Sequence, residues 1–432
     1  MSLSQPLRLF AWALCLAIAP NVAGQGAVLV TDLGDPGAFQ TLQSAIDAAS
    51  DGDVILLRGI GSVEFDLAGK SLVIQGDDSG PFTPQVGGGG SSNIMGISSL
   101  HSVIRDLTPG QTVVLRGMTL HGLELMNVQG QVWIEDCTLR TTAPALRASQ
   151  TAKLVVENST MTGPDTYVDD QAYNPPVFGG RGVELTDTDA AFHGVMVSGG
   201  DGLDYHCDIF SACWNDPGWD ALQISGGSLT VDSGSFSGGF GGAGGTFAGW
   251  CSPGLPGGHG ISVSGGTPLI TLASTALSGA PGGDGLGQGN CSGGDGSDGA
   301  DGQPIALGAG TLITSSSSGG GLTADSPVRE GDSIQISLAG QGNASLAMVL
   351  APSPDLYNLA VVNGPMLVAP SFIPFFLGNL PSSGQLDLTL PIPELGPGID
   401  SLTLVAQALH RPAGGSWQAG SASAIVLLDG GL

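Results

Sequence analysis

Four polar residues open similar glycine-rich stretches and are the first candidates for chemistry. Arg181 stands in GGRGVEL, Asp220 in GWDALQI, His259 in GGHGISV and Gln303 in GQPIAL. A carboxylate and an imidazole act as general base and acid when they are held next to each other. Arg181, Asp220 and His259 are therefore the catalytic candidates. The alternatives are a polar ladder that fastens the ends of loops, or a binding site for a charged or sugar ligand.

Four inserts, roughly residues 163–180, 199–219, 238–258 and 279–303, carry three of the six tryptophans and three of the four tyrosines. Exposed aromatic rings on loops are platforms for stacking sugar rings or for gripping a partner. The alternative is that the rings pack the long loops against one another. The candidate ligand-binding residues are Tyr205, Trp214, Trp219 and Trp250.

The inserts also hold four cysteines, which we predict to form disulfides: Cys207, Cys213, Cys251 and Cys291. Cys251 and Cys291 occupy nearly matching places in adjacent inserts, and Cys207 with Cys213 would close a small loop. Cys213 with Cys251 stays open, because four cysteines allow three pairings. Cys137 falls in an apolar column and is interpreted as a buried free thiol.

Three aspartates follow one another at three-residue spacing in the last insert, at Asp295, Asp298 and Asp301. Ca²⁺ takes several carboxylate and carbonyl oxygens, so a calcium loop is one interpretation. A solvated glycine-rich loop is the other. No other metal or cofactor is predicted.

Composition excludes some classes of protein. The 432 residues include 73 glycines and carry a net charge of −27, which disfavours nucleic-acid binding because that needs positive charge against phosphate. Residues 1–24 resemble a signal peptide, which predicts export to an oxidising compartment. No later segment is expected to span a membrane.

A repeat in the middle of the chain predicts the fold. Seven segments align without gaps, starting at Val113, Val132, Leu154, Ala190, Leu229, Ile270 and Thr311, and their third residue is apolar every time. Short strands precede the later ones, at 183–185, 222–224, 261–263 and 305–307. A coil of this kind cannot bury its apolar face alone, so stacked coils are expected. Insertions on one face of such a stack often build the binding surface.

These repeats resemble the right-handed parallel β-helix of the pectate-lyase-like superfamily. The stretch DPGAFQTLQSAIDAASDGDVILL resembles the capping helix and first strand of that family. We expect Asp35 to cap this helix and Pro36 to fill its first turn. The resemblance implies an all-β fold over residues 25–320, with a helix covering the open end of the coils.

The same resemblance brings a catalytic comparison. Polygalacturonases carry an Asn-Thr-Asp motif, an Asp-Asp pair, Gly-His-Gly and Arg-Ile-Lys at successive coils. Here Arg181 stands in place of the first aspartate, and Trp219-Asp220 in place of the pair. Gly258-His259-Gly260 is kept, and no Arg-Ile-Lys follows Gln303. An inverting glycosidase needs two carboxyl groups. A calcium-dependent lyase with Arg181 as its base is the other enzymatic interpretation.

Residues 321–432 are predicted to form a small β-sandwich, because several stretches alternate apolar and polar residues. Residues 370–384 are expected to be an apolar connecting loop. The whole chain is thus predicted to be a secreted or cell-surface bacterial protein with a non-catalytic binding, adhesion or structural role. A polysaccharide or surface glycan is the expected partner. A polysaccharide lyase or glycoside hydrolase is the alternative, and the oligomeric state is left open.

Overall fold

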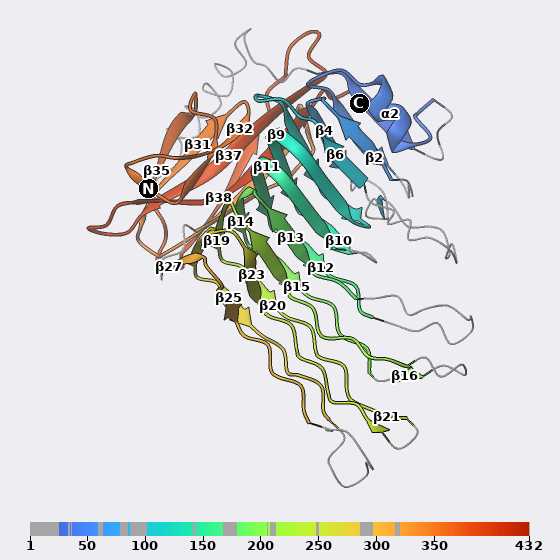
Figure 1. The fold of residues 1–432 in the computed structure, drawn as a ribbon. Coiled ribbons are helices and arrows are strands. Elements are labelled where there is room, and N and C mark those ends of the chain that lie inside the picture. Colours follow the sequence, from blue (N-terminus) through green and yellow to red (C-terminus); the bar gives the residue numbers. More distant parts are fainter. Residues whose placement is uncertain are drawn as a thin grey trace.

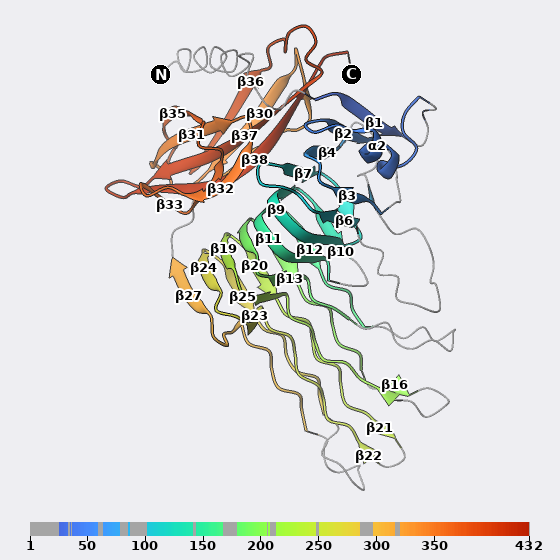
Figure 2. The ribbon, with the colours of Figure 1, turned by 45° about the horizontal axis from the view of Figure 1, so that its top comes forward.

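The computed structural model describes residues 26–32, 35, 37–58, 64–77, 85–86, 102–140, 144–166, 179–204, 206–207, 213–247, 250–285, 297–315 and 320–431. Within it a stack of parallel coils is joined to a sandwich of mostly antiparallel strands (Figure 1). The sandwich lies beside the coils that come first in the chain, and four extended arms run away from the later coils (Figure 2). The predicted all-β fold, a parallel β-helix followed by a β-sandwich, is confirmed.

Each complete coil contributes strands to three faces. The first face consists of β3 (Asp66–Ala68), β6 (Ser102–Arg105), the first parts of β9 (Leu123–Glu135) and β11 (Leu146–Glu157), β13 (Val183–Thr186), β18 (Leu222–Ser225), β23 (Ile261–Gly265) and β26 (Ile305–Ala306). The second face consists of β1 (Val28–Asp32), β2 (Val54–Arg58), β4 (Leu72–Gly76), β7 (Thr112–Arg116), the last parts of β9 and β11, β14 (Asp189–His193), β19 (Ser228–Asp232), β24 (Leu269–Ala273) and β27 (Thr311–Ser315).

The third face is a sheet of very short strands. It consists of β5 (Gln85–Val86), β8 (Thr119–Leu120), β10 (Thr138–Arg140), β12 (Thr160–Thr162), β15 (Met196–Ser198), β20 (Ser235–Ser237) and β25 (Ala276–Ser278). A residue with positive φ turns the chain from the second face to the third. This position is filled by Gly117, Asp136, Asn158, Gly194, Ser233 and Ser274. Each repeat segment is therefore two strands with a corner between them, which the alignment alone did not reveal.

The predicted register of the repeats is confirmed with one exception. Leu115, Ile134, Val156, Phe192, Val231 and Leu272 stack inside the coils and are buried. In the last coil, however, Leu272 pairs with Thr314, and Leu312 pairs with Ile270. The predicted start at Thr311 was therefore wrong by one residue, and Ile313 points outward, where it is exposed.

The capping helix exists, but it starts later than predicted. α2 spans Leu42–Ala48, with Thr41 as its N-cap accepting a hydrogen bond from the Ser44 N–H. Asp35 instead stabilises a turn, since its Oδ1 accepts from the Gly37 N–H at 2.8 Å. Leu42 and Ile46 are buried against the first coils, as the apolar stripe predicted.

The sandwich consists of a three-stranded sheet, a six-stranded sheet and a hairpin. The small sheet is β28 (Gly321–Ala324), β30 (Ser333–Ala339) and β36 (Gln385–Pro391). The large sheet is β29 (Val328–Arg329), β38 (Trp417–Leu428), β37 (Ser401–Arg411), β31 (Ser345–Ala351) and β35 (Ile373–Asn379), with β33 (Val362–Asn363) also on β38, and the hairpin is β32 (Pro354–Asn358) with β34 (Pro365–Val368). The expected loop at 370–384 was wrong: β35 is an edge strand, where Pro374 is tolerated.

The sandwich packs on the outer side of the second face of the coils. One column of outward-facing residues there is apolar in the early coils and shares a buried cluster with the sandwich: Val54, Leu56, Val73, Val114, Trp133, Val155 and Ala191. In later coils the paired positions are Thr230 and Thr271. The outer column of the coils thus changes from apolar to polar where the sandwich no longer covers it.

This docking predicts a large effect at Trp133. Its side chain is fully buried between the coils and the sandwich. Trp133→Ala should lower the free energy of unfolding by about 3–5 kcal/mol, because it leaves a cavity in a packed interface. Thr230→Ala, in the same outer column beyond the sandwich, is the matched control and should cost less than about 1 kcal/mol. Thermal unfolding measures both, and equal losses would contradict the docked arrangement.

Candidate functional site

The four inserts form two layers of extended chain, here called the glycine array. Its outgoing runs are 163–166, 199–204, 238–245 and 279–285, and its returning runs are 179–182, 215–221, 252–260 and 297–304. The arms lie side by side along their length (Figures 1 and 2). Small antiparallel hairpins join an outgoing run to its returning run in two arms: β16 (His206–Cys207) with β17 (Cys213–Trp214), and β21 (Thr246–Phe247) with β22 (Trp250–Cys251).

Hydrogen bonds in the glycine array recur every third residue. Within the outgoing layer, the N–H groups of Gly238, Gly241 and Gly244 bond to the next run at 2.8–3.1 Å. Between the layers, a zigzag runs from Gly180 through Gly200, Trp219, Gly239, Gly258 and Ala280 to Gly302 at 2.8–3.0 Å. Three residues per turn is the period of a polyproline II helix, which has no internal hydrogen bonds and so depends on its neighbours.

Most inward positions are glycine, with Trp219 and Ala280 as exceptions, because backbones meet closely there. A Cβ on Gly239 would lie 2.0 Å from the carbonyl oxygen of Gly200, and one on Gly258 would lie 2.0 Å from that of Trp219. A Cβ on Gly302 would lie 1.9 Å from the oxygen of Gly258. These distances leave no room for any side chain. The glycine content of the inserts therefore encodes close backbone packing rather than flexibility.

The third position of each triplet faces outward, where its N–H has no backbone neighbour. Side chains of the preceding arm supply acceptors there. Asp201 N–H donates to Asp165 at 2.9 Å, Phe240 N–H to Asp201 at 2.8 Å, and Ala243 N–H to Asp204 at 2.8 Å. Part of the acidic excess of the chain thus satisfies backbone donors.

The catalytic candidates Asp220 and His259 also accept hydrogen bonds from backbone N–H groups of the next arm. Oδ1 of Asp220 accepts from the backbone N–H of His259 at 2.8 Å, and Oδ2 accepts from the Ser262 hydroxyl at 2.5 Å. Nδ1 of His259 accepts from the backbone N–H of Gln303 at 2.8 Å. The structure thus brings the predicted residues side by side, but each acceptor is directed at backbone or at serine, and the carboxylate does not bond to the imidazole.

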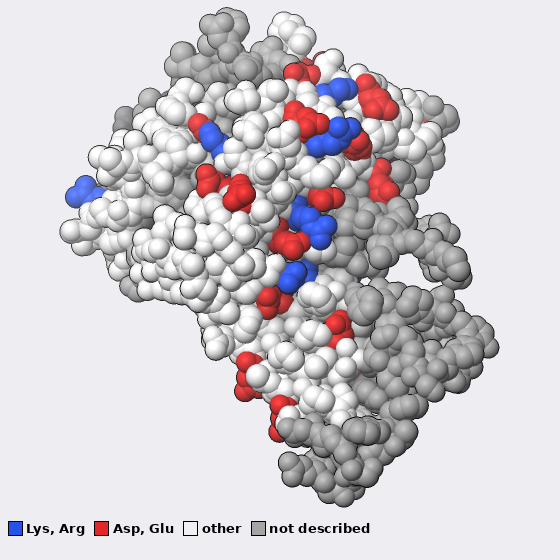
Figure 3. Space-filling model, in the orientation of Figure 1, with Lys and Arg blue, Asp and Glu red and all other residues white. Residues whose placement is uncertain are grey.

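Arg181 completes the column through charge and stacking. Its guanidinium lies 3.5 Å from Glu184 and 3.9 Å from Asp220, and its Cζ stands 5.3 Å from the centre of the Trp219 ring. Trp219 donates its indole N–H to Asp216 at 3.2 Å. Trp219 is therefore half-buried in the base of the array. Figure 3 shows a band of positive and negative side chains over the coils, in keeping with ion pairs such as Arg105–Asp66 and Arg147–Glu184 on the first face.

Asp298 and Asp301 close one edge of the glycine array. The run 279–285 is the last outgoing run, so the N–H groups that point away from the preceding outgoing run have no further outgoing run to bond. Oδ1 of Asp301 accepts from the Gly282 N–H at 3.1 Å, and Oδ1 of Asp298 accepts from the Gly285 N–H at 2.8 Å. Among the described residues, no group of three acidic, histidine or cysteine side chains is placed to hold a metal ion. Asp295 lies outside them, so the calcium loop stays a prediction.

The remaining predicted residues are only partly described. Tyr205 and Cys291 lie outside the described residues, and only the backbone is described at Trp214, Trp250, Cys207 and Cys213. Cys207 is directly opposite Cys213 in the first hairpin, and Cys251 is buried and disulfide-bonded. The pairing among the four cysteines stays a prediction.

Cys137 is a buried free thiol, as predicted. Burial raises its pKa to about 12, so the thiolate that would react is not formed at neutral pH.

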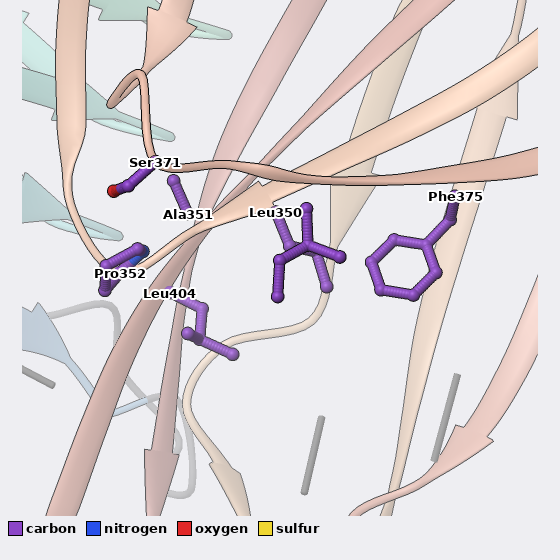
Figure 4. Close-up of a pocket in the computed structure, with 7 residues that line it drawn as sticks. Leu350, Ala351, Pro352, Ser371, Phe375 and Leu404 are labelled. Atoms are coloured by element: carbon purple, nitrogen blue, oxygen red, sulfur yellow. The ribbon is translucent and has the colours of Figure 1, made fainter. Parts of the chain in front are cut away.

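A shallow cavity of about 200 Å³ lies in the sandwich beside β31, β35 and β37 (Figure 4). Its walls are Leu350, Ala351, Pro352, Ser371, Ile373, Phe375 and Leu404. Only Ser371 offers a polar side chain, so this cavity has no acid–base pair.

Sequence reasoning found the polar column and missed the array that explains it. The signal was present as triplets of the form Gly-Gly-x, for example GGFGGAGG from Gly238 and GAPGGDG from Gly279. No helix among the described residues is long and apolar enough to cross a membrane. Models of known protein families give no match to the chain, and no curated protein matches its sequence.

Close packing in the glycine array predicts a sharp cost for a single methyl group. Gly258→Ala should destabilise the protein by at least about 1–3 kcal/mol, because the new Cβ overlaps a backbone oxygen that cannot rotate away. Gly415→Ala is the matched control, since its Cβ would meet nothing closer than 3.4 Å. Thermal unfolding compares the two, and a Gly258→Ala protein as stable as the control would contradict the array.

Proposed function

We propose that this chain is an exported parallel β-helix protein with a non-catalytic binding, adhesion or structural role, built on the scaffold of the pectate-lyase-like superfamily. In this proposal the glycine array is a rigid spacer that carries the cysteine- and aromatic-rich ends of the arms away from the coils. A polysaccharide or cell-surface glycan is the proposed partner. Trp214, Trp250 and Tyr205 are the residues proposed to stack on its rings.

The observation that carries the proposal is the commitment of the polar column to backbone hydrogen bonds. General acid–base catalysis needs a carboxyl or imidazole group that can reach a substrate proton. Both oxygens of Asp220 are already occupied, and Nδ1 of His259 is occupied by the Gln303 N–H. Hydrogen bonding to the backbone and to Ser262 is therefore enough to explain why Asp220 and His259 are present, without a catalytic role.

A lyase would need a neutral basic residue at the site. Arg181 lies between Glu184 and Asp220 and under the Trp219 ring, and a guanidinium stays protonated in proteins. A hydrolase would need a second free carboxyl beside Asp220, and Glu184, which shares Arg181 with Asp220, pairs with Arg147 and Arg181. No contact in the described residues favours the enzymatic alternative.

Glycan binding and turnover should separate in one set of assays. The mature protein, incubated with acidic polysaccharides with and without Ca²⁺, should release neither reducing ends nor unsaturated products. The same protein should be retained by immobilised glycan. Trp214→Ala with Trp250→Ala should reduce retention by at least about tenfold, since stacking on one ring is worth about 1 kcal/mol or more. Trp417→Ala, an aromatic loss in the sandwich, is the control and should bind normally.

Two outcomes would contradict this proposed function. Product release that disappears in Asp220→Asn or His259→Gln would show that the column is catalytic. Retention that is lost equally in the Trp417→Ala control would show that the arms do not carry the binding surface.

A further inference from the structure

A column of polar side chains crosses the buried contact between coils and sandwich. It consists of the outward-facing residues at paired positions of successive strands, here called the joint column: Gln75, Arg116, Glu135, Glu157, His193 and Asp232. All six are buried, with exposed fractions of 6% or less. Beside the joint column lies the apolar cluster shared by coils and sandwich, while ion pairs such as Lys153–Asp355 lie at its margin.

The first half of the joint column is fully engaged by the sandwich. Glu135 accepts from the Ser423 hydroxyl at 2.6 Å and from the Ala424 N–H at 2.7 Å, and it also accepts from the indole of Trp133 at 3.0 Å. Arg116 donates to the carbonyl oxygens of Ala324 and Ala424 and lies 3.4 Å from Glu135. These contacts tie β7 and β9 to β28 and β38.

Glu157 and His193, the next step of the column, are engaged less completely: the backbone N–H of Ala422 in β38 lies close enough to Glu157 to favour its ionised form, but without a regular hydrogen bond. Both carboxylate oxygens of Glu157 lack a hydrogen bond of regular geometry, and so does Nδ1 of His193, although Nδ1 lies 3.2 Å from Oε1 of Glu157. Glu157 is completely buried and His193 is 3% exposed. A fully buried carboxylate with no hydrogen bond of regular geometry is unfavourable when ionised and more easily tolerated when protonated.

The environment of this pair favours bound protons. Burial raises the pKa of Glu157 to about 7, against the opposing effects of His193 and of the Ala422 backbone N–H, and with a further rise from Glu135. For His193, burial lowers the pKa, but the nearby carboxylates Glu157 and Asp232 outweigh it, so the net direction is upward. Burial also raises the pKa of Glu135.

The packed elements contribute few other charges. On the coils, Arg116, Glu135 and Asp232 flank the pair, with Asp136 at the corner beside Arg116. On the sandwich, β38 and β34 carry no titratable side chain. β32 carries Tyr357 and also Asp355, which forms an ion pair with Lys153 of β11. The sandwich therefore offers Glu157 no cation to compensate its charge.

We propose that Glu157 and His193 make the contact between coils and sandwich a pH-dependent joint, closed firmly in mild acid and weakened as the pH rises through neutrality. Opening the joint would return both side chains to water. A group whose pKa is higher in the closed state contributes stability that is complete below its open-state pKa and is lost as the pH rises through the closed-state pKa. Both groups have that sign, but they are coupled, because the ionised Glu157 is itself the main cause of the rise for His193. Their effects therefore do not add, and Glu157 sets the scale.

The window and the size of the effect follow from Glu157. Its pKa moves from 4.5 when open to about 7 when closed, so the loss occurs between these values. That displacement limits the change in the closed-to-open ratio to roughly 300-fold. We expect a change of one to two orders of magnitude between pH 5 and pH 8.

Hydrogen–deuterium exchange of the whole mature protein tests the joint. Protection of amides in 419–428 of β38, corrected for intrinsic exchange and referred to β36 in the other sheet, should fall 10- to 100-fold from pH 5 to pH 8. Glu157→Gln and Glu157→Leu remove the titrating carboxyl group. In both variants most of the fall in amide protection between pH 5 and pH 8 should disappear. Glu184→Gln, which removes a carboxylate on the first face, is the matched control and should keep the wild-type slope.

A flat wild-type profile would overturn the proposal without any variant. So would a slope in Glu157→Leu that equals the slope of the wild type, because the fall would then come from groups outside the pair. The double variant Glu157→Leu with His193→Leu guards against a folding failure of the single variants, since it leaves neither member of the pair buried without the other. Glycan retention is irrelevant to either outcome, so the joint and the proposed function fail independently.

Discussion

A backbone N–H must find an acceptor, and this requirement explains the arms. An extended run with three residues per turn bonds to nothing within itself, so its donors depend on neighbouring runs. At positions such as Gly239 and Gly258 the runs lie so close that a Cβ would overlap a neighbouring carbonyl oxygen. The glycine array meets this requirement for acceptors by alternating outgoing and returning runs, and the coils set the spacing because each arm leaves from the same place on successive turns.

That dependence changes the meaning of the polar residues around it. Asp165, Asp201 and Asp204 accept from N–H groups on the outer surface of one layer, and Asp220 and His259 do the same on the other. Asp298 and Asp301 perform this role at the edge. A histidine between glycines therefore belongs to a repeating pattern of acceptors, and the resemblance to a catalytic motif comes from its position at the entry of a coil.

Sequence predicted the fold well where side chains repeat at fixed spacing. The stacked apolar column, the free thiol at Cys137 and the strands of the sandwich all followed from patterns of burial. Errors arose where backbone geometry decides: the start of α2 at Leu42, the register of the last coil, and the edge strand β35. The array and the joint column escaped prediction because each depends on which chains meet, and one strand alone does not show that Glu157 lies under β38.

The central claim is that the arms are a hydrogen-bonded lattice and not loose glycine-rich loops. Amide exchange in the arms tests it most directly, because loose loops exchange at nearly intrinsic rates whereas bonded amides do not. We predict that amides of 238–244 and 254–260 are protected to a degree comparable with strands β18 and β19. Exchange of these amides within about tenfold of intrinsic rates, while β18 and β19 stay protected, would contradict the account.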